Sequence, residues 1–288
     1  MLNNCALCPA ACGANRNSVV GRCGEKNQMR IAKYYLHKYE EPVLTGRNGS
    51  GTIFFCGCSL KCAFCQNYAL SRSETGKAIT PEELADIFRE LEADGAANIN
   101  LVTPTHFAPL IAKAYNIYRP KIPTVYNTHS YETIETLKIL EEFVDVYLPD
   151  LKFFSPDISE RYTGRRDYFD AASKAIKYMF DAKKTTFDEN GNMLSGVIVR
   201  HMIIPLCVED SKKITRWFAE NAKNGAYFSL MAQYTPFGNT DKFPELKRPL
   251  TAREYERVYE ELLSSGITDY FLQELGSASE SFIPEWDF

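Results

Sequence analysis

From residue 50 onward, short apolar segments alternate with longer segments whose apolar residues recur at helical spacing. Six of the short segments are predicted to be strands, at residues 52–55, 98–102, 124–126, 144–148, 197–204 and 227–232. Strands that alternate with helices predict a parallel sheet with the helices outside it, and right-handed crossovers curl such a sheet into part of a barrel. We therefore predict an α/β fold, a partial (β/α)6 barrel.

Several helix ends carry recognisable signals. Thr80 and Glu83 form a capping box in front of a helix over residues 81–93, where Pro81 takes the first position. A helical stretch over residues 156–182 is expected to break near Gly164. Asp210 is expected to cap the helix that follows the fifth strand.

The first 50 residues differ from the rest of the chain. They are rich in cysteine, contain several glycines and show no extended periodic pattern. We predict two units on this basis, a cysteine-rich N-terminal module over residues 1–50 and the partial barrel over residues 51–288.

Composition and charge are those of an ordinary globular enzyme. The chain has 288 residues, of which 45% are hydrophobic and 24% charged, and a formal net charge of −4. No apolar run approaches the roughly 20 residues that span a bilayer, and no basic, then apolar, leader opens the chain. No long basic stripe predicts nucleic-acid binding. We expect a cytoplasmic protein with neither membrane nor nucleic acid as a partner.

The nine cysteines change this picture, because eight of them fall within the first 65 residues. In a reducing cytoplasm such clusters are more often metal sites or catalytic thiols than disulfides. Cys56 and Cys207 stand apart from the two groups described next, and we interpret them as packed thiols.

Cys58, Cys62 and Cys65 follow the first predicted strand with C-x3-C-x2-C spacing. Iron–sulfur clusters are normally held by four cysteines, so three thiolates on one loop would leave one iron of a four-iron cluster open to a substrate or cofactor. The alternative is a structural zinc site, since zinc also takes cysteines at short spacings. The position of the loop at the end of a buried-type strand favours the cluster.

This spacing, with the aromatic Phe64 before the last cysteine, closely resembles the radical S-adenosylmethionine (SAM) enzymes. The resemblance implies a 4Fe–4S cluster whose open iron binds the amino and carboxylate groups of SAM, with Phe64 near the cofactor. It also implies that one electron from the cluster cleaves SAM to a 5′-deoxyadenosyl radical, which abstracts hydrogen from a substrate. The cofactors do the hard chemistry, and the protein positions them.

Polar and ionisable residues recur at the ends of the predicted strands, where parallel barrels gather their functional groups. SAM requires such partners for its carboxylate, hydroxyls and sulfonium. Among them, His106, His129 and Tyr234 are candidates for acid–base roles, and a hydrogen-bonded structural role is the alternative for each.

Within that superfamily the chain most resembles activating enzymes of glycyl-radical enzymes, in particular proteins named pyruvate formate-lyase activating enzyme-like. The stretches that carry the resemblance are Gly51–Cys58, Cys65–Tyr68, Asn100–His106, Val125–Thr128, Leu148–Lys152 and Val197–His201. It implies SAM contacts by Thr128, Asp150, Lys152 and Arg200, a protein or peptide substrate, an electron donor such as flavodoxin or ferredoxin, and anaerobic chemistry. The alternatives are a surface ion pair for Asp150 and Lys152, and a structural salt bridge for Arg200.

The chain departs from those activases after the second strand. They usually carry Gly-Gly-Glu there to hold the SAM amino group, whereas this chain has Thr103-Pro104-Thr105. Hydroxyls and backbone carbonyls of Thr103 and Thr105 would have to substitute in binding SAM.

The second cysteine group is Cys5, Cys8, Cys12 and Cys23, with C-x2-C-x3-C-x10-C spacing and flanking glycines. Four thiolates complete the coordination of zinc or of an auxiliary 4Fe–4S cluster, so this site is expected to be closed. The spacing leaves both metals open.

Three functions follow as hypotheses. The first is a radical SAM enzyme acting on a protein or peptide, in the manner of an activase. The second is a radical SAM enzyme acting on a small molecule. The third is a metal-stabilised binding module without radical turnover, which predicts no 5′-deoxyadenosine from SAM.

Overall fold

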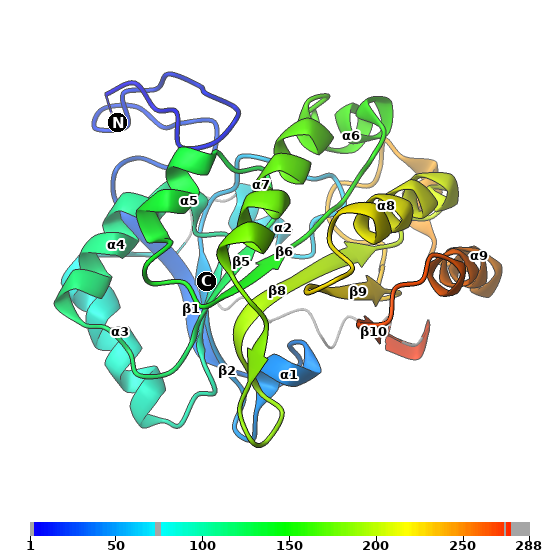
Figure 1. Ribbon diagram of the computed structural model, residues 1–288. Coiled ribbons are helices and arrows are strands. Elements are labelled where there is room, and N and C mark those ends of the chain that lie inside the picture. Colours follow the sequence, from blue (N-terminus) through cyan, green and yellow to red (C-terminus); the bar gives the residue numbers. More distant parts are fainter. Residues whose placement is uncertain (1–2, 73–75, 274, 278–288) are drawn as a thin grey trace.

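A curled sheet of seven consecutive parallel strands forms the centre of the protein (Figure 1). The computed structural model describes residues 3–72, 76–273 and 275–277. The parallel strands are β2 (Ser50–Phe55), β4 (Ile99–Val102), β5 (Thr124–Thr128), β6 (Val146–Pro149), β8 (Met193–Met202), β9 (Tyr227–Met231) and β10 (Tyr270–Leu272). The first six are the strands predicted from the sequence. The fold class, a partial (β/α) barrel, is thereby confirmed.

Antiparallel strands extend this sheet at one edge. β1 (Met29–His37) pairs with β2 over six residue pairs and with β3 (Lys77–Ile79) on its other side, while β7 (Thr186–Phe187) forms a hairpin with β8. The predicted boundary between residues 50 and 51 falls inside β2, one residue after its start, and it separates β1 from the strand with which it pairs. Of the first 50 residues, 3–28 and 38–49 lie outside the sheet, and residues 3–28 are called the N-terminal segment below.

Helices cover the outer face of the sheet (Figure 1). The longer ones are α3 (Pro81–Ala93), α4 (Ala108–Ile117), α5 (Ile134–Leu140), α7 (Tyr168–Ala182), α8 (Val208–Asn221) and α9 (Ala252–Ser264). The shorter elements are α1 (Pro42–Thr45), α2 (Tyr68–Arg72), η1 (Thr105–Phe107), α6 (Pro156–Thr163), η2 (Pro244–Lys247) and η3 (Leu275–Ser277). None of the described helices is long and apolar enough to cross a membrane.

Local signals fix most helix ends as predicted. The Thr80 hydroxyl accepts from the Glu83 amide in a complete capping box, and Gly164 ends α6 in the left-handed conformation. The prediction for Asp210 was wrong, because Cys207 is the N-cap of α8. Asp210 lies in the first turn, where its carboxylate accepts the amides of Phe154 and Ser155 at 2.8 Å each.

The two faces of the barrel strands differ in polarity. Residues such as Ile53, Leu101 and Tyr126 belong to the main core, together with apolar residues of the helices. Their neighbours along the strands, including Thr52, Asn100 and Asn127, line or border the barrel interior. Because alternate residues point to opposite faces of a strand, one apolar face packs under the helices and the other can carry a polar site.

A second, smaller core closes one end of the barrel. Leu44 of α1 is 1% exposed and clusters with Val125, Val146, Leu148 and Ile198 from three adjacent strands. In Figure 1, α1 lies at the opposite end of the sheet from the N-terminal segment. None of these residues lines the cavity described below, which is bordered by residues at the carboxyl ends of the strands.

Candidate active site

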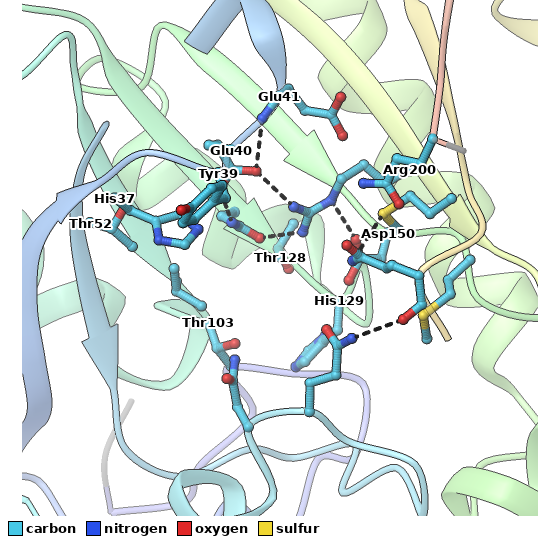
Figure 2. A pocket seen from close by; sticks show the side chains of 18 of the residues that line it. His37, Tyr39, Glu40, Glu41, Thr52, Thr103, Thr128, His129, Asp150 and Arg200 are labelled. Atoms are coloured by element: carbon cyan, nitrogen blue, oxygen red, sulfur yellow. Dashed lines mark hydrogen bonds and ion pairs between the residues drawn. The ribbon is translucent and has the colours of Figure 1, made fainter. Parts of the chain in front are cut away.

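A cavity of about 770 Å³ occupies the barrel interior and brings the two main sets of predicted residues together. Cys58, Cys62 and Cys65 line it, and so do Asp150 and Arg200. Figure 2 shows Thr52 of β2, Thr128 of β5 and Arg200 of β8 converging on this cavity. Further predicted residues in the lining are Phe64, Thr103, Thr128, His129 and Lys152.

Close backbone contacts shape the cysteine loop. Lys61 has φ +52°, a left-handed conformation that tightens the turn between Cys58 and Cys62. Gly238 packs across the loop, since a Cβ there would lie 2.5 Å from the Ala63 oxygen, and the next amide, of Asn239, donates to that oxygen at 2.9 Å. The loop is thus held by a distant segment that lacks a side chain at the point of contact.

Phe64 lies in the same loop and is 4% exposed. Its ring packs against Phe153, Tyr162 and Tyr234, with ring centroids 5.8 to 6.4 Å apart. Such edge-to-face contacts fix the orientation of the ring. Phe64 therefore anchors the cysteine loop to the barrel as well as lining the cavity.

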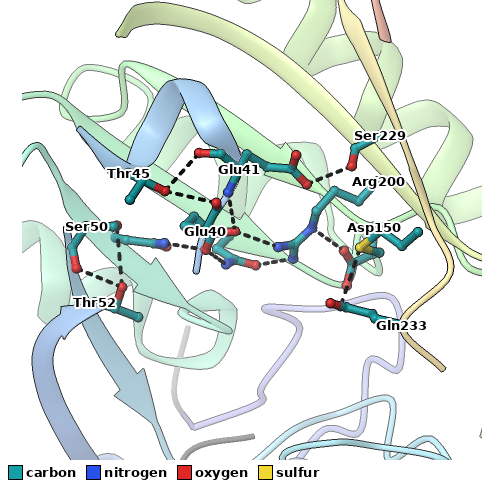
Figure 3. Close-up of polar contacts among 12 residues, drawn as sticks. Glu40, Glu41, Thr45, Ser50, Thr52, Asp150, Arg200, Ser229 and Gln233 are labelled. Atoms are coloured by element: carbon teal, nitrogen blue, oxygen red, sulfur yellow. Dashed lines mark hydrogen bonds and ion pairs between the residues drawn. The ribbon is translucent and has the colours of Figure 1, made fainter. Parts of the chain in front are cut away.

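A connected set of charges centred on Asp150 and Arg200 forms one wall of the cavity (Figure 3). Lys152 Nζ donates to Asp150 Oδ2 at 2.7 Å, and Arg200 Nε donates to Asp150 Oδ1 at 2.8 Å. Arg200 also donates to Asn127 Oδ1 at 2.7 Å and to Glu40 Oε1 at 3.2 Å. The Asp150 and Lys152 pair is less than one-fifth exposed, so it is no surface ion pair.

Burial and ion pairing shift the pKa values of the charged residues in this wall in opposite directions. Burial raises the pKa of Asp150, but Arg200 and Lys152 outweigh it and hold that pKa below its usual value. Burial lowers the pKa of Lys152, and the Asp150 carboxylate outweighs it and raises that pKa. The pair is therefore ionised near neutral pH.

Comparison with known proteins identifies the family. The sequence profile of the radical SAM superfamily matches residues 52–195, half of the chain. This chain belongs to the radical SAM superfamily. A relative in Methanocaldococcus jannaschii, the uncharacterized protein MJ0674, is 33% identical over 273 residues, which are 90% of this chain and 74% of that protein.

Solved structures share the fold of this chain. SuiB of Streptococcus suis, crystallised with S-adenosylmethionine, superposes with a TM-score of 0.53 at 16% identity, over 78% of this chain and 52% of SuiB. SuiB crystallised with its precursor peptide SuiA gives the same TM-score and identity, over 77% of this chain and 48% of SuiB. The radical SAM chain described here thus spans about half the length of SuiB, and at this identity the likeness shows the fold.

The donor set fits the cofactors that the superfamily implies. Three thiols on one loop face a cavity that also presents a lysine, an arginine and threonine hydroxyls. His129 lines the cavity, its Nδ1 accepts from the Tyr131 amide at 3.1 Å, and its ring lies against the Cys58 thiol. A buried ring N–H directed at a cysteine sulfur suits a donor to a cluster thiolate. Cys58, Cys62 and Cys65 would hold the cluster.

The predicted threonines have different environments in this radical SAM site. Thr103 lines the cavity with φ +58°, and Thr128 lines it while its hydroxyl donates to Glu132. Thr105 lies outside the cavity lining and is 1% exposed, with its hydroxyl donating to Glu132 Oε1 at 2.6 Å. Thr105 thus supports the strand end through Glu132 and does not face the cavity.

Two candidates for acid–base roles have structural partners. His106 donates through Nε2 to the Cys56 carbonyl at 2.6 Å, and burial lowers the pKa of His106 to about 3, so it is neutral. The Tyr234 hydroxyl donates to the Leu246 carbonyl at 2.7 Å. Cys56 and Cys207 are both buried and outside the cavity lining, as expected of packed thiols.

Sequence reasoning missed the acidic cavity residues Glu40 and Glu41, which follow β1. Glu40 Oε2 accepts from Asn100 at 2.8 Å, and Glu41 Oε1 accepts from Ser229 at 2.8 Å (Figure 3). The available signal was a pair of acids directly before Pro42 at a helix start. Nothing local shows that their partners lie on the far strands of the barrel.

Proposed function

We propose that this protein cleaves SAM reductively at a 4Fe–4S cluster held by Cys58, Cys62 and Cys65, and that it abstracts hydrogen from a peptide or protein. The observation that carries the proposal is the convergence of these cysteines with Asp150, Lys152 and the other charged wall residues in one cavity. When bound, the cluster and SAM supply a 5′-deoxyadenosyl radical.

The chain's own residues would bind and orient SAM. Lys152 Nζ has three donors and gives one to Asp150, which leaves two for a carboxylate such as that of the methionine moiety. Asp150 has both oxygens engaged, by Lys152 and by Arg200, so it orients these two cations. Thr103 and Thr128 add backbone and hydroxyl groups on the adjacent strand ends.

The size and edges of the cavity support a substrate that inserts a single residue. Ligand pockets for small organic molecules typically enclose roughly 300–1,000 Å³, so SAM would fill much of this one and leave room for about a side chain or a short loop. The lining includes His37 at the end of β1 and Tyr39 just after it, and Phe271 of β10 and Gln273 just after it. β10 is one edge of the open sheet, and β1 lies next to β3 at the other edge. A peptide loop could enter between these edges.

The activase-like stretches also support a peptide or protein substrate, and so does the likeness in fold to SuiB, which was crystallised with its precursor peptide. A small molecule is the alternative, since the same residual space would hold one. A one-electron donor such as flavodoxin or ferredoxin would supply the reducing equivalent.

The origin of the abstracted hydrogen decides between these substrates. The reconstituted protein, dithionite and SAM are incubated anaerobically with a deuterated cell extract separated into macromolecules and small molecules. Deuterium in 5′-deoxyadenosine is then read by mass spectrometry, with Cys62→Ala as the inactive control. Deuterium from the macromolecular fraction supports the proposal, and deuterium from the small-molecule fraction alone assigns the alternative. No 5′-deoxyadenosine from the reconstituted protein would overturn both.

A glycyl-radical partner requires a further observation. A stable electron paramagnetic resonance (EPR) signal with a single α-hydrogen splitting, formed on an added partner backbone, would identify an activase. Its absence with deuterium transfer from a peptide would indicate a different peptide modification.

A further inference from the structure

The four N-terminal cysteines lie close together in the segment over residues 3–28. Backbone hydrogen bonds from the Cys5 amide to Ala14 and from the Gly13 amide to Cys5, each 3.1 Å, fold the first cysteines into a compact loop. Gly21 brings in the last one, since a Cβ there would lie 3.4 Å from Cys23 Sγ and 3.6 Å from Cys12 Sγ. Cys5 in turn lies beside Cys12.

This segment docks directly on the loop that carries Cys58. The Cys58 amide donates to the Cys23 carbonyl at 3.0 Å, and Arg22 Nε donates to the Ser59 carbonyl at 3.3 Å. Gly57 permits the approach, because a Cβ there would lie 2.8 Å from the Cys23 oxygen and 2.5 Å from Glu25 Cγ. One backbone hydrogen bond therefore joins the two cysteine groups.

The placement of the group favours a cluster over a single zinc ion. Zinc has no redox chemistry, whereas a 4Fe–4S cluster held by four thiolates can accept and release one electron. The group runs from the protein surface inward, since Cys12 is exposed and Cys23 is buried beside the Cys58 loop, and an electron relay requires this placement.

We propose that Cys5, Cys8, Cys12 and Cys23 hold a second iron–sulfur cluster that relays electrons to the site at Cys58, Cys62 and Cys65. A one-electron donor of the flavodoxin or ferredoxin class reduces the N-terminal cluster. That cluster passes one electron inward through the contact between Cys23 and Cys58 and returns to its oxidised state, while the inner site gains one electron. No bond forms or breaks, and the cavity stays free for SAM and substrate. The relay rests on the proposed function. The prediction that the N-terminal cysteines bind iron does not rest on it.

Metal content tests the site itself. The anaerobically reconstituted wild type should hold about eight irons and eight sulfides per chain, and the variant Cys58→Ala, Cys62→Ala, Cys65→Ala about four of each. Cys207→Ala, which removes a buried thiol outside both groups, should keep the full content. Wild type with about four irons, with or without one zinc, overturns the second cluster whatever happens to the folding of the variants.

Spin coupling and donor choice test the relay. In the fully reduced wild type the two clusters should split or broaden each other's EPR signals. Gly57→Ala should weaken that coupling at unchanged iron content. Gly24→Ala is the matched control, because Gly24 also has positive φ, follows a ligand and meets nothing within 4 Å of an added Cβ. Equal coupling in wild type and Gly57→Ala overturns the assigned path.

With all four N-terminal cysteines changed to serine, dithionite should still reduce the inner cluster while a flavodoxin-class donor fails. Equal reduction by both donors overturns the relay. Iron content and cluster reduction are measured without SAM or substrate, so failure here is distinguishable from failure of the proposed reaction.

Discussion

Replacing Glu41 by glutamine should remove a pH dependence of stability that its buried carboxyl creates. The Glu41 side chain lies in the barrel interior, 6% exposed, and accepts a hydrogen bond from Ser229. Burial raises the pKa of Glu41 to about 7, and the nearby Arg200 opposes this only in part. Glutamine has nearly the same shape and keeps an acceptor for Ser229, but it does not titrate.

The sign of this pH dependence follows from how many protons the folded and unfolded chains bind. Between the unfolded pKa of 4.5 and the folded pKa of about 7, the folded chain holds a proton that the unfolded chain has released. The stabilisation is fully present below the unfolded pKa and is lost as the pH rises through the folded pKa. The difference between the folded and unfolded pKa values of Glu41 corresponds to roughly 3 kcal/mol of stability, of which about 2 kcal/mol is lost between about pH 5.5 and about pH 7.5.

Urea unfolding at these two pH values measures the effect, in protein of matched metal content. The free energy of unfolding of wild type should fall by about 2 kcal/mol more than that of Glu41→Gln on going to the higher pH. Glu220→Gln, on an exposed position of α8, should behave like wild type. The same pH dependence in wild type and Glu41→Gln would refute the reasoning.

Three further changes test other parts of the structure. Arg200→Met leaves Asp150 and Glu40 without their shared cation and should cost about 3–5 kcal/mol in urea unfolding, whereas an unchanged midpoint would contradict the charged wall. Gly238→Ala places a Cβ 2.5 Å from the Ala63 oxygen, so iron bound at the inner site should fall in colorimetric assay while far-ultraviolet circular dichroism is unchanged. Arg16→Met removes a buried cation that donates to three backbone carbonyls and should cost about 3 kcal/mol or more, with faster proteolysis of residues 3–28 than in wild type.

The repeating units of the barrel could be predicted from the sequence because their signals are local. A run such as Val197–Val199 reads as a buried strand by itself, and the Thr80 capping box specifies its helix start within four residues. β1 was missed because its pattern is only partly alternating and its partner, β2, was assigned to a different unit. Pairing between strands depends on residues that are distant in the sequence, so the sequence of β1 alone does not predict its partner.

The cysteine loop was predictable for a different reason: its ligands are contiguous. The charged wall is not, since Arg200 meets Glu40 across 160 positions and Asn127 across 73. A buried arginine in an apolar strand predicts that partners exist, because an unpaired buried charge is costly, but it does not say where they lie. The structure adds those partners, and with them the carboxylates after β1 that form part of the cavity.

For Thr103, the sequence and the structure each supply a different part of the explanation. The sequence shows threonine where the activases usually carry glycine, and the structure shows φ +58° at that residue. A left-handed conformation costs a non-glycine residue about 1–2 kcal/mol, and more when the side chain is β-branched. The Thr103 amide donates to the Asn127 carbonyl at 2.8 Å, so sheet pairing holds this backbone in place against that cost. The chain thus keeps a glycine-like backbone at the cavity wall while placing a hydroxyl there, and strain of this kind persists where surrounding structure over-determines a functional position.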